Sequence, residues 1–163
     1  MSEKSTKRSF ALVWFILFAV AIACMVFPTG IFYNRAAKGE TINYAGLKCV
    51  FGGIPYPSEY GHGQVLSGFN VGLFIGFALP LVSVVFYAIF GSIMKKRWAV
   101  AIMAFGFLAS FILLFCAVPL FAAVAGRDAN QFAIGYGPVI GAIIGCVGFL
   151  ISSIIGIRNI FVK

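Results

Sequence analysis

The sequence predicts an all-α membrane protein, a four-transmembrane-helix bundle with a small extracellular β-hairpin in the loop between helices one and two. Three observations predict this fold class. Of the 163 residues, 62% are hydrophobic and 10% are charged, whereas soluble domains carry roughly 25% charged residues. Four long apolar runs contain no Asp, Glu, Lys, Arg or His. The charged residues lie in short clusters outside these runs. We therefore expect one helical domain whose solvent is the lipid bilayer.

Each apolar run is long enough to span a membrane, which needs ~20 predominantly apolar residues. The predicted helices cover residues 10–27, 68–91, 99–124 and 136–157. The first run follows a basic segment, as in a signal peptide, but it exceeds the usual ~7–15 residues of a signal-peptide core. We therefore expect it to remain as an uncleaved anchor.

The basic residues predict the orientation of the bundle. Eight of the twelve Lys and Arg residues lie on one side of an even-numbered bundle, and four lie on the other. Because Lys and Arg are favoured in cytoplasmic segments, both termini are predicted to be cytoplasmic, and the expected location is the plasma membrane. The net charge of +8 is then an orientation signal with contact to anionic lipid. It does not indicate nucleic-acid binding.

The long external loop, residues 28–67, contains the predicted hairpin. Residues 41–51 alternate in polarity, and Ala45-Gly46 is the expected two-residue turn. One apolar face would then carry cross-strand neighbours: Ile42, Tyr44, Leu47, Cys49 and Phe51. Because an isolated hairpin is marginal in water, we expect it to dock on the helices or on a partner's strand.

The next segment, residues 52–63, holds two prolines and four glycines, which prevent regular structure. One interpretation is a partner-binding tip on a rigid scaffold. The other is a connector whose tyrosines sit among the lipid headgroups. The candidate partner-binding residues of the whole loop are Tyr44, Leu47, Phe51, Tyr56, Tyr60 and His62.

Glycines recur at four-residue spacing in helices two and four, where they form flat faces that allow close approach of another helix. The candidate helix-packing residues are Gly68, Gly72, Gly76, Gly137, Gly141 and Gly145. We expect these faces to pack against each other or against another copy of the chain. Pro80 and Pro119 lie inside helices two and three and are expected to kink them.

Several chemistries are not indicated. The apolar runs lack the ionisable residues that mark proton relays, no Gly-rich phosphate loop is visible, and a single histidine, His62, cannot by itself build a zinc site. We therefore expect no metal, no cofactor and no enzymatic activity. A Cys24–Cys49 disulfide and reduced, buried cysteines are both open.

Four helices with a long first loop resemble the claudin layout in topology. The nearest loop stretch, residues 44–49, lacks the tryptophans and the second cysteine of claudins, so their paracellular role is not implied. Asn43-Tyr44-Ala45-Gly46-Leu47, followed by Val50-Phe51-Gly52-Gly53, also resembles small uncharacterised four-helix membrane proteins of Gram-positive bacteria. That resemblance implies a bacterial plasma membrane and no known activity.

The leading functional hypothesis is a protein that acts by contact, as an accessory subunit of another membrane protein or as a self-associating scaffold. The alternative is a pore-forming oligomer or a transporter subunit, for which Asn70 is one of few polar helix residues. A third class is an enzyme that uses the external side chains of Glu59, His62 and Asp128.

Overall fold

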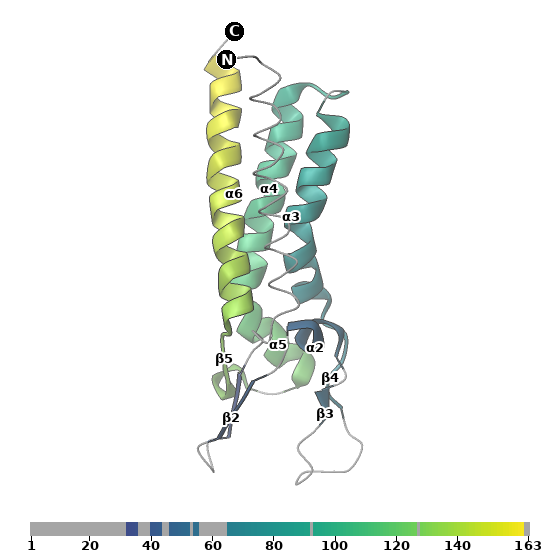
Figure 1. The fold of residues 1–163 in the computed structure, drawn as a ribbon, viewed down its shortest axis with the longest axis vertical. Helices are drawn as coiled ribbons and strands as arrows, with labels where there is room; N and C mark the ends of the chain where they lie inside the picture. Colours follow the sequence, from purple (N-terminus) through teal and green to yellow (C-terminus); the bar gives the residue numbers. More distant parts are fainter. Residues whose placement is uncertain are drawn as a thin grey trace.

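The computed structural model describes residues 32–35, 40–43, 46–52, 54–55, 65–91, 93–126 and 128–161. The predicted first helix, residues 10–27, lies outside this part of the chain. Three long helices, α3 (Val71–Phe90), α4 (Lys96–Phe115) and α6 (Tyr136–Phe161), run side by side (Figure 1). Each is long and apolar enough to cross a membrane. The described chain is thus a mostly helical, multi-pass membrane protein.

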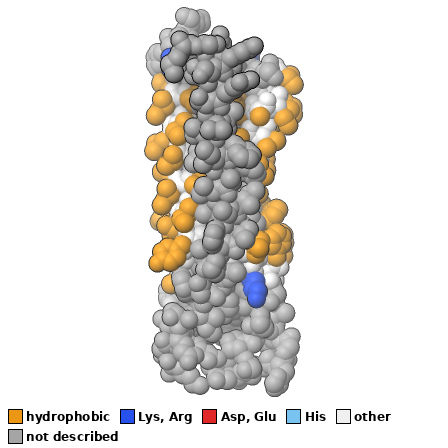
Figure 2. Space-filling view, in the orientation of Figure 1, with side chains coloured by type: hydrophobic (Ala, Val, Ile, Leu, Met, Phe, Trp, Pro, Cys, Tyr) orange, Lys and Arg blue, Asp and Glu red, His pale blue; other side chains and the backbone are white. Residues whose placement is uncertain are grey.

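Helix α4 packs along both α3 and α6, while α3 and α6 have few contacts with each other. We call the end where α3 and α6 begin the loop end, and the opposite end, where α4 begins, the turn end (Figure 1). Large apolar side chains remain exposed along all three helices, and Figure 2 shows them along the outside of the bundle. Such an outer surface suits lipid, because the helix backbone satisfies its own hydrogen bonds.

The third predicted helix is two helices, so the expectation of one continuous span over residues 99–124 is wrong. Helix α4 ends at Phe115, and α5 (Ala117–Ala125) begins after Cys116, whose φ of −87° and ψ of 21° are not helical. Pro119 supplies the reason, because it has no N–H and its ring clashes with the carbonyl four residues earlier, that of Phe115. Helix α5 ends at Ala125 and is capped by Gly126, whose φ of 62° lies in the left-handed region that favours glycine.

The loop end carries two small sheets. Strand β1 (Phe32–Arg35) pairs antiparallel with β2 (Glu40–Asn43) and, on its other edge, with β5 (Phe132–Ala133). A second pair joins β3 (Ile54–Pro55) to β4 (Val65–Ser67). A short 3₁₀ helix, η2 (Ala129–Gln131), precedes β5.

The predicted hairpin across Ala45-Gly46 is wrong. Residues Gly46–Phe51 form a helix, α2, and β2 pairs with the preceding strand, with Arg35 opposite Glu40. Short apolar runs fit both helical and strand periods, and Ala-Gly is a weak hairpin turn. The helix is favoured here because it buries Cys49 and Val50 together in the core at the loop end.

The described core has two parts. The larger part lies at the loop end, where α2, α5 and β5 pack against the long helices; its members include Val50, Leu73, Phe77, Leu114 and Phe121. A smaller part lies around Met103 and Phe107 of α4. The loop end therefore holds the larger of the two described cores, and the exposed surface at this end lies on it.

Candidate functional site

Asn70 joins three helices at the loop end. It caps α3, because its Oδ1 accepts a hydrogen bond from the Leu73 N–H at 3.0 Å. Its Nδ2 donates to the Leu120 carbonyl of α5 at 3.0 Å, and its backbone N–H donates to the Val50 carbonyl of α2 at 2.8 Å. The residue is 1% exposed. Its polar atoms thus hold α2, α3 and α5 together.

This cap also corrects the predicted start of the second helix. The prediction began at Gly68, whereas α3 begins at Val71 after the cap, since an N-cap residue has a non-helical backbone. Because the Asn70 side chain is buried and used for capping, it gives no support to a polar path near this residue.

The seam between α3 and α4 contains a second buried hydrogen bond. Pro80 has no N–H, so the Gly76 carbonyl, four residues earlier, loses its helical donor. The Ser110 hydroxyl of α4 donates to that carbonyl at 2.7 Å. Nearby, a Cβ on Gly106 would clash with the Ser83 hydroxyl oxygen. Small residues therefore bring these two helices close enough for a side chain to replace the missing backbone donor.

The seam between α6 and α4 rests on glycines. A Cβ on Gly145 would lie 2.9 Å from the Phe111 nitrogen and 3.0 Å from the Phe107 carbonyl oxygen, both of them α4 backbone atoms. A Cβ on Gly148 would overlap the Phe107 ring. One on Gly141 would lie 2.6 Å from Leu114. Of these glycines, Gly145 is the one whose added Cβ would meet the α4 backbone itself, so this position has the strictest need for glycine.

The α3 glycines face different neighbours. A Cβ on Gly72 would lie 3.1 Å from Leu120 of α5, and one on Gly76 would lie 3.0 Å from Leu114 of α4, while Gly68 has open space around it. Gly137 is buried near the start of α6.

Within the chain, the expected mutual packing of helices two and four is therefore largely replaced by packing on α4. The two helices do meet where a Cβ on Gly141 would lie 3.3 Å from the Phe77 ring. The physical reason is that α4 lies between them.

Three phenylalanines form an exposed cluster at the loop end, which we call the aromatic patch. Phe51 of α2 lies with its ring centroid 5.9 Å from that of Phe69 and 6.0 Å from that of Phe74, and the last two are 5.6 Å apart. Their side chains are 54%, 49% and 37% exposed. The Val50 carbonyl that accepts the Asn70 bond is adjacent to Phe51, so the patch sits on the buried three-helix junction.

The structure describes only part of the predicted partner-binding loop. Leu47 and Phe51 are exposed on α2, one helical turn apart. Phe69 and Phe74 were not among the predicted residues, although Asn70 as a helix cap would have placed Phe69 outside the helix. The remaining predicted loop residues lie outside the described chain: Tyr44, Tyr56, Tyr60 and His62.

The other predicted groups divide in the same way. Asp128 is exposed, and Glu59 lies outside the described residues. Cys49 is buried and Cys24 lies outside the described residues, so a bridge between them stays a prediction. Among the side chains that the structure describes, no three His, Cys, Asp or Glu residues come together as a metal site.

Comparison with protein-family models, with curated proteins and with solved structures finds no match to this chain.

Proposed function

We propose that this chain is a non-enzymatic plasma-membrane protein that acts by protein–protein contact, as an accessory subunit or as a self-associating scaffold. The observation that carries the proposal is the aromatic patch. Exposed apolar clusters on a well-packed base are typical of interaction sites, and aromatic residues are enriched among the residues that dominate binding energy. Here three rings stand together on a junction whose buried polar groups are hydrogen-bonded.

We further propose that this patch lies outside the cell. Lys95, Arg97 and Arg158 are exposed at the turn end, and basic residues favour the cytoplasmic side. The loop end then faces the exterior, and both termini are cytoplasmic. Partners within reach of the patch are another membrane protein or a second copy of this chain.

A pore-forming oligomer or a transporter subunit has less support. The buried polar side chains of the described helices are Asn70, Ser83, Ser110 and Ser152. Asn70 caps a helix, Ser83 and Ser110 lie in the seam between α3 and α4, and Ser152 bonds to its own helix.

The test is a pulldown of the tagged full-length chain from native membranes in mild detergent, followed by native mass spectrometry. The double variant Phe51→Ala/Phe69→Ala removes two rings of the patch. The matched control is Phe105→Ala, which removes a 71% exposed ring from the middle of α4. All three proteins should have similar melting temperatures, because the changed side chains are exposed.

We expect wild type and Phe105→Ala to retain a partner, or a second copy, at fixed stoichiometry, and the double variant to lose most of it. A truncated anchor in an interface typically costs about 2 kcal/mol or more. The same assembly in all three proteins, or a bare monomer throughout, would contradict the proposal.

A further inference from the structure

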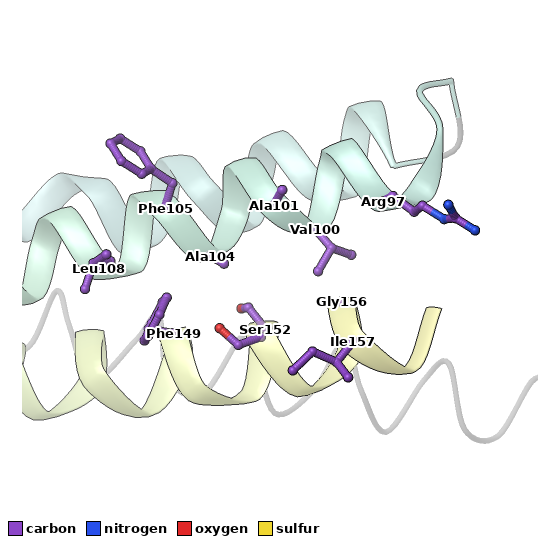
Figure 3. Close-up of a pocket in the computed structure, with 11 residues that line it drawn as sticks. Arg97, Val100, Ala101, Ala104, Phe105, Leu108, Phe149, Ser152, Gly156 and Ile157 are labelled. Atoms are coloured by element: carbon purple, nitrogen blue, oxygen red, sulfur yellow. The ribbon is translucent and has the colours of Figure 1, made fainter. Parts of the chain in front are cut away.

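A groove of about 410 Å³ opens between α4 and α6 at the turn end. Figure 3 shows side chains of the two helices that face each other across it. Those that form its floor are Val100, Ala104 and Leu108 from α4, with Phe149, Ser152 and Gly156 from α6. Several lining residues are small, among them Ala104, Ser152 and Gly156. Larger side chains at these positions would fill the space between α4 and α6.

The groove is apolar along its length and basic at one end. Among the described residues that line it, Arg97 is the charged one, and its guanidinium lies at the end of the groove (Figure 3). The Ser152 hydroxyl donates to the Gly148 carbonyl at 2.7 Å. Its proton is therefore already hydrogen-bonded within its own helix and is not available to a ligand.

The position of Arg97 on α4 shows where the groove lies relative to the apolar span of that helix. The apolar span of α4 runs over Arg97–Phe115, so Arg97 marks a boundary of the span and the remaining lining residues of α4 lie inside it. Lys95 and Arg158 are exposed at the same end, whereas the described acidic residues, Glu40 and Asp128, belong to the loop end. An occupant that matches this surface is apolar over its length and anionic at one end.

We propose that this groove binds one anionic phospholipid of the surrounding bilayer, with an acyl chain between α4 and α6 and the phosphate on Arg97. A guanidinium matches phosphate oxygens with paired, charge-assisted hydrogen bonds. Basic pockets between membrane helices on the cytoplasmic side suit anionic headgroups. Because lipid offers no hydrophobic drive for burying a further apolar chain, the headgroup contact supplies the selectivity. The proposal does not depend on a protein partner at the loop end.

The test is native mass spectrometry of the delipidated full-length protein in mild detergent. Phosphatidylglycerol and phosphatidylcholine with identical acyl chains are added separately. Both lipids carry the phosphate, but phosphatidylcholine adds a choline cation that the basic end of the groove repels. Wild type should therefore bind one phosphatidylglycerol about tenfold more tightly than phosphatidylcholine. Arg97→Gln should reduce phosphatidylglycerol to the level of phosphatidylcholine. Lys95→Gln removes an equal charge that does not line the groove, and it should retain the preference.

A second set of variants tests the groove itself. Ala104→Leu and Ser153→Leu each add volume to its lining, and the single tight phosphatidylglycerol adduct should be lost. Ile102→Phe is the control, because Ile102 lies on α4, is exposed and does not line the groove. Equal binding of the two lipids to wild type, or tight phosphatidylglycerol binding that survives Arg97→Gln and both groove-filling variants, would overturn the proposal. Loss of the partner in the aromatic-patch variants would leave these adducts unchanged.

Discussion

At the scale of single residues, two of the described buried polar side chains, those of Asn70 and Ser110, bond to backbone groups that have no helical partner. Asn70 satisfies a helix start and a carbonyl of α5, and Ser110 satisfies the carbonyl that Pro80 leaves without a donor. Buried polar atoms are costly unless they are bonded, and lipid offers no water as a substitute. The sequence marks these residues as unusual in apolar runs, but their partners lie 50 and 34 positions away. Periodicity and composition within a segment carry no information about such long-range pairs.

The Ser110 bond predicts a coupling with Pro80. Ser110→Ala leaves the Gly76 carbonyl unsatisfied and should lower the free energy of unfolding by about 0.5–1.5 kcal/mol, the usual net contribution of an intramolecular hydrogen bond. In a Pro80→Ala background the helix regains its own N–H donor, so the same change should cost clearly less. Unfolding in mixed micelles measures all four corners of this double-mutant cycle.

The matched control is Ser152→Ala. Its hydroxyl bonds to the Gly148 carbonyl at 2.7 Å, which can still accept the N–H of residue 152 in the same helix. We expect a smaller loss there, independent of Pro80. Additive effects of Ser110→Ala and Pro80→Ala would show that the hydroxyl does not replace the missing donor.

At the scale of elements, apolar runs predict where membrane helices lie better than how they end or pair. The runs at 68–91 and 136–157 correspond to α3 and α6 within a few residues. The run at 99–124 gave no compositional sign of its break, since apolar residues continue through Cys116, and only Pro119 pointed to it. The α2 segment was mistaken for a strand because six residues fit two periods. Of the candidate site, Leu47 and Phe51 were predicted, whereas Phe69 and Phe74 join them only through tertiary packing.

The glycine contacts predict a sharp difference between two positions of the same residue type. Gly145→Leu would push a side chain into the α4 backbone at Phe107 and Phe111, and a helix backbone cannot move aside locally. We expect the free energy of unfolding to fall by about 1–3 kcal/mol or more, since this is the usual cost of overpacking. Gly68→Leu is the control, because nothing lies within 4 Å of its added Cβ.

Thermal unfolding in detergent, read by circular dichroism, measures the effect of both substitutions. The midpoint of Gly145→Leu should fall by several degrees or the protein should fail to assemble, while that of Gly68→Leu should stay near wild type. Equal midpoints for the two variants would mean that the α4–α6 contact is not as close as described.

At the scale of the whole molecule, the two ends of the bundle differ in net charge, because the basic residues Arg35 and Lys48 of the loop end are accompanied by Glu40 and Asp128. The turn end carries exposed Lys95, Arg97 and Arg158, and the loop end carries the two small sheets and the aromatic patch. This asymmetry was predictable, because it depends on counting Lys and Arg between apolar runs and not on packing. The central place of α4 was not, because the order of helices around a bundle depends on contacts between their faces.

Orientation can be measured with single cysteines and a membrane-impermeant thiol reagent on intact cells. Met94→Cys lies in the exposed turn after α3, and Asp128→Cys lies in the exposed connection before α6. We expect the reagent to label Asp128→Cys in intact cells and Met94→Cys only after the membrane is opened. Wild type controls for the native cysteines. The reverse pattern would place the turn end, where α6 ends, outside the cell.

The position of α4 between α3 and α6 has a consequence for which substitutions the chain can accept. The side chains of α4 contact α3 along one flank and α6 along another. A substitution in α4 must therefore fit against two neighbouring helices. Outward positions of α3 and α6, such as Val82 and Ile154, are exposed along the bundle, so we expect them to accept other apolar residue types. Mutational tolerance should therefore fall toward the middle of the bundle, and sequence drift should concentrate on its two flanking helices.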